Sequence, residues 1–285
     1  MPQHHSPIDP IQQPIERVAS HLWFERLARF GYATKGLVYF VIGLLAIQAA
    51  LGLGGRTTDS SGALETIVTQ PFGQFLLFIV TIGIIGYVLW RFVQAILDPE
   101  NADRKTDAKQ VVQRIGYAIS AIAYTGLAFT AIKLLTGSGG NNGNATQDWT
   151  ARFMAQPFGR WLIGLTGILV ISMGLYMVYK AIKAKFRGEL QWQQMNFKER
   201  SWATLIGKFG IAARGLVFTV IGLFLTQAAL KSDPSEAKGI GEALATLAQQ
   251  PFGQWLLGFV ALGLIAYSFY CLIEAKYRQI VRDNA

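Results

Sequence analysis

The sequence predicts an all-α integral membrane protein with six transmembrane helices, arranged as three pseudo-repeated helical hairpins. Three features of the chain support this prediction: the spacing of its charged residues, an internal repeat, and the distribution of Lys and Arg. Charged residues make up 15% of the chain, against about 25% in an ordinary soluble domain. The composition is therefore typical of a membrane protein.

Six long uncharged segments separate the charged residues, and they contain between 16 and 31 residues each. A helix that crosses the hydrocarbon core of a bilayer needs about 20 apolar residues. The shortest segment qualifies because Arg214 and Lys231 reach the two interfaces through their long side chains. We expect the six transmembrane helices near residues 31–53, 72–97, 114–136, 158–183, 208–230 and 252–277.

The chain repeats itself three times. Residues 31–51 and 210–230 are identical at 13 of 21 aligned positions, and residues 116–136 match the same pattern more weakly. Self-similarity of this kind indicates copies of one structural unit. The predicted organisation is a polar cytoplasmic tail at 1–25, hairpin repeats at 26–98, 111–185 and 205–278, and a cytoplasmic interfacial connection at 186–204.

The motif Gln-Pro-Phe-Gly precedes the second helix of every copy. Proline is favoured at the first helical position, because the N–H that it lacks would have no partner there. Aromatic side chains suit a membrane interface. We interpret the motif as a signal that starts the returning helix on the outer side, rather than as a substrate loop. Its residues are Pro71, Phe72, Gly73, Pro157, Phe158, Gly159, Pro251, Phe252 and Gly253.

The segments ahead of the three motifs are predicted to form short amphipathic helices on the outer surface. Glycines spaced seven apart in the first helices of two copies are predicted to form a seam where helices approach closely. These glycines are Gly36 and Gly43 in the first copy and Gly215 and Gly222 in the third.

Lys and Arg are concentrated on one side of the predicted membrane. Twenty lie on the side of the termini and five on the other, while Lys133 falls inside the third helix. An excess of cations marks cytoplasmic loops, so both termini are expected in the cytoplasm, with the helices in the plasma membrane. The expected partners are the lipid bilayer, anionic lipid headgroups and a candidate membrane protein. This distribution explains the net charge of +9 without nucleic acid.

Two sets of polar residues occupy equivalent positions within the predicted helices, and such residues are functional candidates because they are costly in a membrane. Gln48, Lys133 and Gln227 lie toward the outer ends of the first helices. If they converge on one axis, they suit an anion or a polar headgroup. The favoured alternative is that Lys133 extends to the interface and the glutamines form interhelical hydrogen bonds.

The second set lies at the cytoplasmic ends of the second helices and consists of Gln94, Lys180 and Glu274. Lys180 and Glu274 would pair if the three units formed a ring. Lys35 and Arg214 are also equivalent to each other, and we interpret them as cytoplasmic anchors.

The sequence provides no arrangement for catalysis, so we expect no enzyme activity, no catalytic residues and no cofactor. The histidines are His4, His5 and His21, all in the N-terminal tail, and Cys271 is the only cysteine. A defined zinc site needs three or four convergent ligands, so no metal site is expected.

The segments GYATKGLVYFVIGLLA and GIAARGLVFTVIGLFL and the recurring PFG motif resemble a bacterial membrane family catalogued as domain of unknown function 1206. The resemblance covers about residues 26–280 and implies three tandem two-helix repeats. The middle copy departs from it at Ser120 and Ala121. The resemblance implies no activity. Two hypotheses about function follow: a non-catalytic scaffold or accessory protein, or a channel or transporter for a small anion or polar solute that uses Gln48, Lys133 and Gln227.

Overall fold

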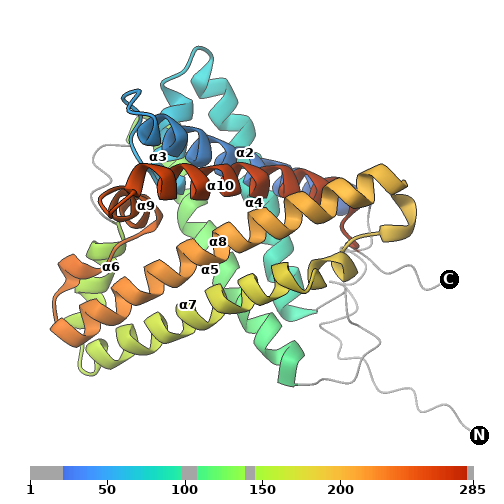
Figure 1. Ribbon diagram of the computed structural model, residues 1–285. Helices are drawn as coiled ribbons and strands as arrows, with labels where there is room; N and C mark the ends of the chain where they lie inside the picture. Colours follow the sequence, from blue (N-terminus) through green and yellow to red (C-terminus); the bar gives the residue numbers. More distant parts are fainter. Residues whose placement is uncertain (1–21, 98–107, 139–144, 281–285) are drawn as a thin grey trace, which may run out of the picture.

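The computed structural model describes residues 22–97, 108–138 and 145–280, and it contains six helices that are long and apolar enough to cross a membrane (Figure 1). The six are α2 (Leu22–Ala50), α4 (Gly73–Ile96), α5 (Ala108–Leu135), α7 (Gly159–Ile182), α8 (Phe197–Lys231) and α10 (Gly253–Tyr277). Their lengths satisfy the requirement for spanning the hydrocarbon core. The predicted class, an all-α integral membrane protein with six transmembrane helices, is confirmed.

Short helices precede the second long helix of every copy, as predicted. They are α3 (Ser60–Val68), α6 (Ala145–Met154) and α9 (Ile240–Ala248). Three 3₁₀ turns complete the described elements: η1 (Lys185–Glu189), η2 (Trp192–Gln194) and η3 (Pro234–Glu236). The predicted tail at 1–25 lies outside the described residues as far as residue 21, and its three histidines lie outside them as well.

Three of the long helices begin earlier than the charge pattern predicts. Helix α2 already includes residues 22–30, α8 begins at Phe197, and α5 begins at Ala108. A capping box explains the second start: the Asn196 side chain accepts from the N–H of Glu199, and the Glu199 carboxylate accepts from the N–H of Asn196. Residues 197–204, expected in an interfacial connection, therefore belong to α8.

The long helices pack in the order α5, α4, α2, α10, α8, α7. The second helix of each copy packs on the first helix of the next: α4 on α5, α7 on α8, and α10 back on α2. The second copy differs from the hairpin expected at 111–185. Its helices α5 and α7 stand at opposite ends of this order and form no close pair over their described residues.

Glycines explain why α7 pairs with α8 instead. A Cβ atom on Gly174 would lie 2.6 Å from the carbonyl oxygen of Gly215, and one on Gly222 would lie 2.8 Å from the carbonyl oxygen of Gly167. Only residues without a side chain allow backbones to approach this closely. On α2, a Cβ on Gly36 would lie 2.9 Å from the carbonyl oxygen of Ser268 on α10. The predicted glycine seam is confirmed at both interfaces.

The Gln-Pro-Phe-Gly motif forms a tight turn between a short helix and a long one. The N–H of Gly73 donates to the carbonyl oxygen of Gln70 at 2.8 Å, and Phe72 adopts a left-handed conformation with φ of 60°. Its equivalents Phe158 and Phe252 have φ of 63° and 60°. Proline is thus the second residue of the turn, a position it favours. The prediction that Pro71, Pro157 and Pro251 open the helices is wrong, since the helices begin two residues later.

The phenylalanines with left-handed backbone conformation have exposed side chains. Phe72, Phe158 and Phe252 are each more than 80% exposed, although a non-glycine residue in this conformation costs about 1–2 kcal/mol. The glycine that follows lies against the preceding helix: a Cβ on Gly73 would lie 2.3 Å from the carbonyl oxygen of Val68. The turn therefore uses each residue of the motif and presents one aromatic ring per copy.

Candidate functional site

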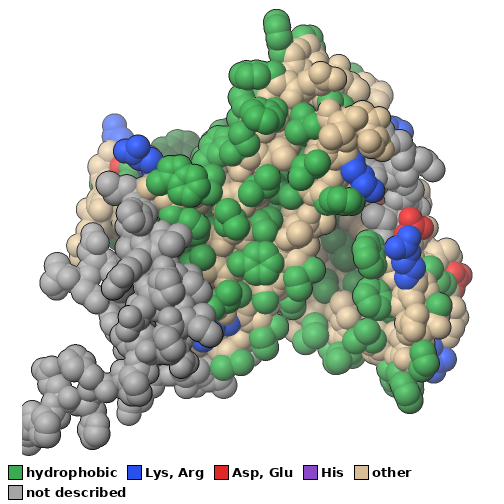
Figure 2. Space-filling view, turned by 180° about the vertical axis from the view of Figure 1, so that it is seen from behind, with side chains coloured by type: hydrophobic (Ala, Val, Ile, Leu, Met, Phe, Trp, Pro, Cys, Tyr) green, Lys and Arg blue, Asp and Glu red, His purple; other side chains and the backbone are tan. Residues whose placement is uncertain are grey.

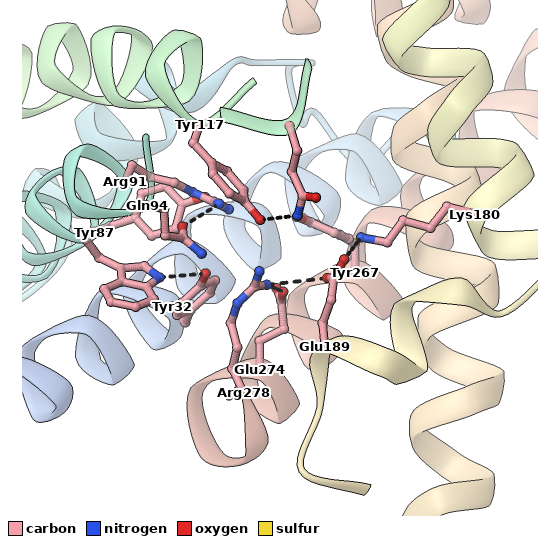
Figure 3. A network of polar contacts seen from close by, with 12 residues as sticks. Tyr32, Tyr87, Arg91, Gln94, Tyr117, Lys180, Glu189, Tyr267, Glu274 and Arg278 are labelled. Carbon is pink, nitrogen blue, oxygen red and sulfur yellow. Dashed lines mark hydrogen bonds and ion pairs between the residues drawn. The ribbon is translucent and has the colours of Figure 1, made fainter. Parts of the chain in front are cut away.

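Buried and partly buried polar side chains gather in the core of the bundle, and several of them are shown in Figure 3. We call this group the cation–tyrosine cluster. Its members are Tyr32 and Lys35 on α2, Tyr87, Arg91 and Gln94 on α4, Tyr117 on α5, Arg214 on α8, Tyr267 and Glu274 on α10, Arg278 just after α10, and Lys180 and Glu189 on α7 and η1.

Helical periodicity places these side chains on inward faces. Tyr87, Arg91 and Gln94 follow one another at steps of four and three along α4, which puts them on one face. Tyr267 and Glu274 are two turns apart on α10, so they also share a face. The cluster therefore forms where the inward faces of neighbouring helices meet.

A chain of ion pairs forms one part of the cluster. Lys180 Nζ lies 2.5 Å from Glu189 Oε1, and the other oxygen of Glu189 lies 3.6 Å from Arg278. Arg278 in turn pairs with Glu274. Lys180 and Glu274, predicted to pair in a ring of units, are thus linked through two residues that the prediction did not include.

Glu189 lies outside the membrane-spanning helices, in η1. Burial alone would raise the pKa of its carboxyl group. The positive charges of Lys180 and Arg278, with the hydrogen bond from Lys180, outweigh burial and hold the pKa below its usual value. Glu189 is therefore an anion that joins two cations from different helices.

Arg91 forms a second part of the cluster. Its Nε donates to the hydroxyl of Tyr87 at 2.7 Å, and one terminal nitrogen donates to Oε1 of Gln94 at 2.8 Å. The guanidinium also lies 5.0 Å from the centre of the Tyr117 ring. Gln94, from the second predicted set, is thus buried as the acceptor of an arginine.

Lys35 lies at the centre of three tyrosine rings. Its ammonium is 5.8 Å from the ring centre of Tyr32, 5.3 Å from that of Tyr87 and 5.1 Å from that of Tyr267. The residue is 3% exposed. The interpretation of Lys35 as a cytoplasmic anchor is therefore wrong, because helix packing encloses it within the bundle.

Arg214 occupies the position of Lys35 in the third copy, and it also turns inward. It donates to the hydroxyl of Tyr267, and its guanidinium lies 5.2 Å from the centre of the Tyr39 ring. Its Nε is buried and has no hydrogen-bond partner among the described residues. The anchor interpretation fails for this residue too.

Gln48, Lys133 and Gln227 are not brought together. Lys133 is exposed, and its ammonium lies 4.7 Å from the ring of Phe129 on the same helix. Gln227 donates to Glu236 at 3.2 Å, in the turn that follows α8, and Gln48 is half-buried on α2. No hydrogen bond joins the three side chains across the described part of the chain. The contacts of Lys133 and Gln227 are local to their own helices and the turn after α8.

A family described as Domain of Unknown Function (DUF1206) matches residues 30–98, 115–184 and 209–278. The chain belongs to this family. The three matches in tandem confirm the resemblance and the three repeated units. The chain is also similar to "Uncharacterized protein YxxB" of Bacillus subtilis (strain 168), with 39% identity over 262 residues that cover 92% of this chain and 94% of that protein. No solved structure matches.

Within this DUF1206 chain, sequence reasoning missed the tyrosines and Arg91. A signal was present: Tyr32 and Tyr117 repeat at one position, and Tyr87 and Tyr267 at another. Aromatic residues at helical spacing are common in any apolar core, so the pattern alone did not distinguish cation partners from packing residues. The distinguishing feature would have been that these tyrosines lie close to Lys35 and Arg214 in the predicted bundle.

The cluster offers hydrogen-bond donors and positive charge rather than a nucleophile with a base. Across residues 22–97, 108–138 and 145–280, no group of three or more His, Cys, Asp or Glu is placed to hold a metal. Cys271 is buried beside the cluster. The arrangement suits electrostatic binding more than covalent chemistry.

Proposed function

We propose that the protein is a non-catalytic scaffold or accessory protein of the bacterial plasma membrane, with both termini in the cytoplasm. Its role is to hold a membrane protein partner against α5 and α7. One observation carries this proposal: the two helices of the middle copy, unlike those of the first and third copies, have no close contact with each other.

The exposed faces of α5 and α7 support the proposal. In each, 22% of the most apolar window is buried, compared with 50–56% in α2, α4 and α10. Figure 2 shows apolar side chains covering much of one face of the molecule. Such faces also suit lipid, so the apolar surface alone does not select a protein partner.

Glycines on α5 favour a helix as the partner. A Cβ atom on Gly116 or Gly126 would meet nothing within 4 Å, whereas Gly174 on α7 and Gly222 on α8 lie against backbone. Small residues in a membrane allow another helix to approach closely. Two such positions on an unpaired helix are therefore consistent with a partner helix that the isolated chain lacks.

Site-specific photocrosslinking in native membranes tests the proposal. Photoreactive residues at Ile122 on α5 and Ile168 on α7 are expected to give one protein adduct of the same mass. Leu262 on α10, exposed to a similar extent, is the control and is expected to give none. Adducts that are absent, or equal at all three positions, would contradict the scaffold proposal.

The alternative, a channel or transporter, depended on convergence of Gln48, Lys133 and Gln227. No hydrogen bond among these three side chains supports that pathway in the described part of the chain. A flux assay with purified protein in liposomes, with Lys133→Ala as the comparison, separates the two functions. We expect no flux of small anions or cations. A flux that Lys133→Ala abolishes would overturn the scaffold proposal in favour of transport.

A further inference from the structure

The charges of the cation–tyrosine cluster do not balance. Its two carboxylates, Glu189 and Glu274, are engaged by Lys180 and Arg278. Lys35, Arg91 and Arg214 remain, and none of the three forms an ion pair with a carboxylate in the described part of the chain. Buried charges in proteins are normally paired, so three unmatched cations in one core indicate a missing anion.

The side chains around Lys35 leave its hydrogen-bonding capacity unused. An ammonium carries three N–H donors and needs acceptors with lone pairs. The contacts of the Lys35 ammonium are with three tyrosine rings, which attract a cation but accept hydrogen bonds only weakly. The unpartnered Nε of Arg214 adds a further donor that is buried without an acceptor.

The three cations are linked through shared aromatic rings. Lys35 and Arg91 approach the Tyr87 ring centre at 5.3 and 4.8 Å. Lys35 and Arg214 approach the Tyr267 ring centre at 5.1 and 4.8 Å. Lys35 therefore shares one ring with each arginine.

We propose that Lys35, Arg91 and Arg214 bind an oxyanion of the phosphate type. Guanidinium groups present planar sets of donors that match the oxygens of phosphate, and the ammonium supplies a point charge between them. This site goes beyond the scaffold function and does not depend on it. The phosphate group comes either from inorganic phosphate or from the headgroup of an anionic phospholipid.

The first arm of the test uses inorganic phosphate. Full-length protein in nanodiscs of phosphatidylcholine is titrated with phosphate, against chloride at the same ionic strength, and its unfolding temperature is measured. We expect a saturable rise with phosphate. Lys35→Met and Arg214→Gln are each expected to weaken binding by about 10-fold or more, the usual effect of losing one hydrogen bond to a charged group. Lys133→Met, which removes an exposed cation, is expected to leave binding unchanged.

The second arm uses lipid. If the phosphate belongs to a headgroup, inorganic phosphate has no effect, and nanodiscs containing phosphatidylglycerol raise the unfolding temperature of the parent protein but not of Lys35→Met. Lys35→Arg keeps the charge and is expected to retain the response, which guards against a variant that merely folds poorly. Both sources support an oxyanion site.

The sign of the Lys35→Met effect distinguishes a binding site from a structural one. Without phosphate or anionic lipid, removal of an unmatched buried charge is expected to leave the unfolding temperature equal or higher. If Lys35→Met lowers it by the same amount with and without the anion, the tyrosines hold Lys35 for packing alone. That result, or a response to neither anion source in the parent protein, would overturn the proposal.

Discussion

Glu189 and Arg278 come within 3.6 Å of each other and join the turn after α7 to the end of α10. Backbone contacts reinforce this link, because the N–H of Gln191 donates to the carbonyl oxygen of Tyr277 at 2.7 Å. Glu189 lies in the connection between the second and third copies, and Arg278 lies at the end of the third. The ion pair therefore fastens this connection to the end of α10.

Removal of the Glu189 charge is expected to destabilise the protein. Glu189→Gln leaves Lys180 and Arg278 without their shared anion, and hydrogen bonds to charged groups contribute about 1.5–3 kcal/mol. Chemical denaturation in detergent measures the loss. Glu236→Gln is the matched control: Glu236 pairs with Lys231, which is more than half exposed, so its loss is expected to cost about 0–1 kcal/mol. Equal effects in the two variants would contradict a special role for Glu189.

Acid is expected to weaken the same link. Because the pKa of Glu189 is lowered in the folded protein, the stability that it contributes is present above the pKa of the unfolded chain and is lost as the pH falls through the folded value. The difference in unfolding temperature between the parent protein and Glu189→Gln should therefore be constant near neutral pH and shrink under acid conditions. A difference that grows on acidification would contradict a lowered pKa of Glu189 in the folded protein.

The turn glycine is expected to be intolerant of any side chain. Gly73→Ala places a Cβ atom 2.3 Å from the carbonyl oxygen of Val68, and overpacking of this kind costs about 1–3 kcal/mol. Gly116→Ala is the control, since nothing lies within 4 Å of its added atom, and alanine favours a helix by up to about 1 kcal/mol. The unfolding temperatures of the two variants should move in opposite directions.

The orientation of the chain is tested by labelling single cysteines in intact cells. In a Cys271→Ser background, Thr69→Cys next to the first turn motif is expected to react with an impermeant thiol reagent. Gly188→Cys, in η1, is expected to react only after the membrane is opened. Both positions are exposed in the structure. The reverse pattern would contradict the orientation inferred from Lys and Arg.

The sequence predicts the individual helices better than it predicts which helices pack together. Long uncharged runs identified all six long helices, because bilayer thickness dictates their length. The seam at Gly36 and Gly215 was also predictable, since only small residues permit close backbone approach. The pairing of α5 with α4, and of α7 with α8, could not be predicted. Similar apolar helices carry no local sequence signal that specifies which helix each one packs against.

The polar core was harder to predict for a physical reason. The positive-inside pattern treats every cation near a helix end as a surface anchor, and that led to misplacement of Lys35 and Arg214. The bundle buries Lys35 and partly buries Arg214, because tyrosines on other helices lie beside them and those helices are distant in sequence. Lys180 and Glu274 were identified by repeat logic, yet their actual partners, Glu189 and Arg278, follow the ends of their helices.

The close contact between α2 and α10 joins the first of the described long helices to the last of them. Because synthesis reaches α2 before α10, α2 enters the lipid without this neighbour and remains without it until α10 has been made. A chain that stops before α10 would therefore lack the packing partner of its α2 helix as well as α10 itself.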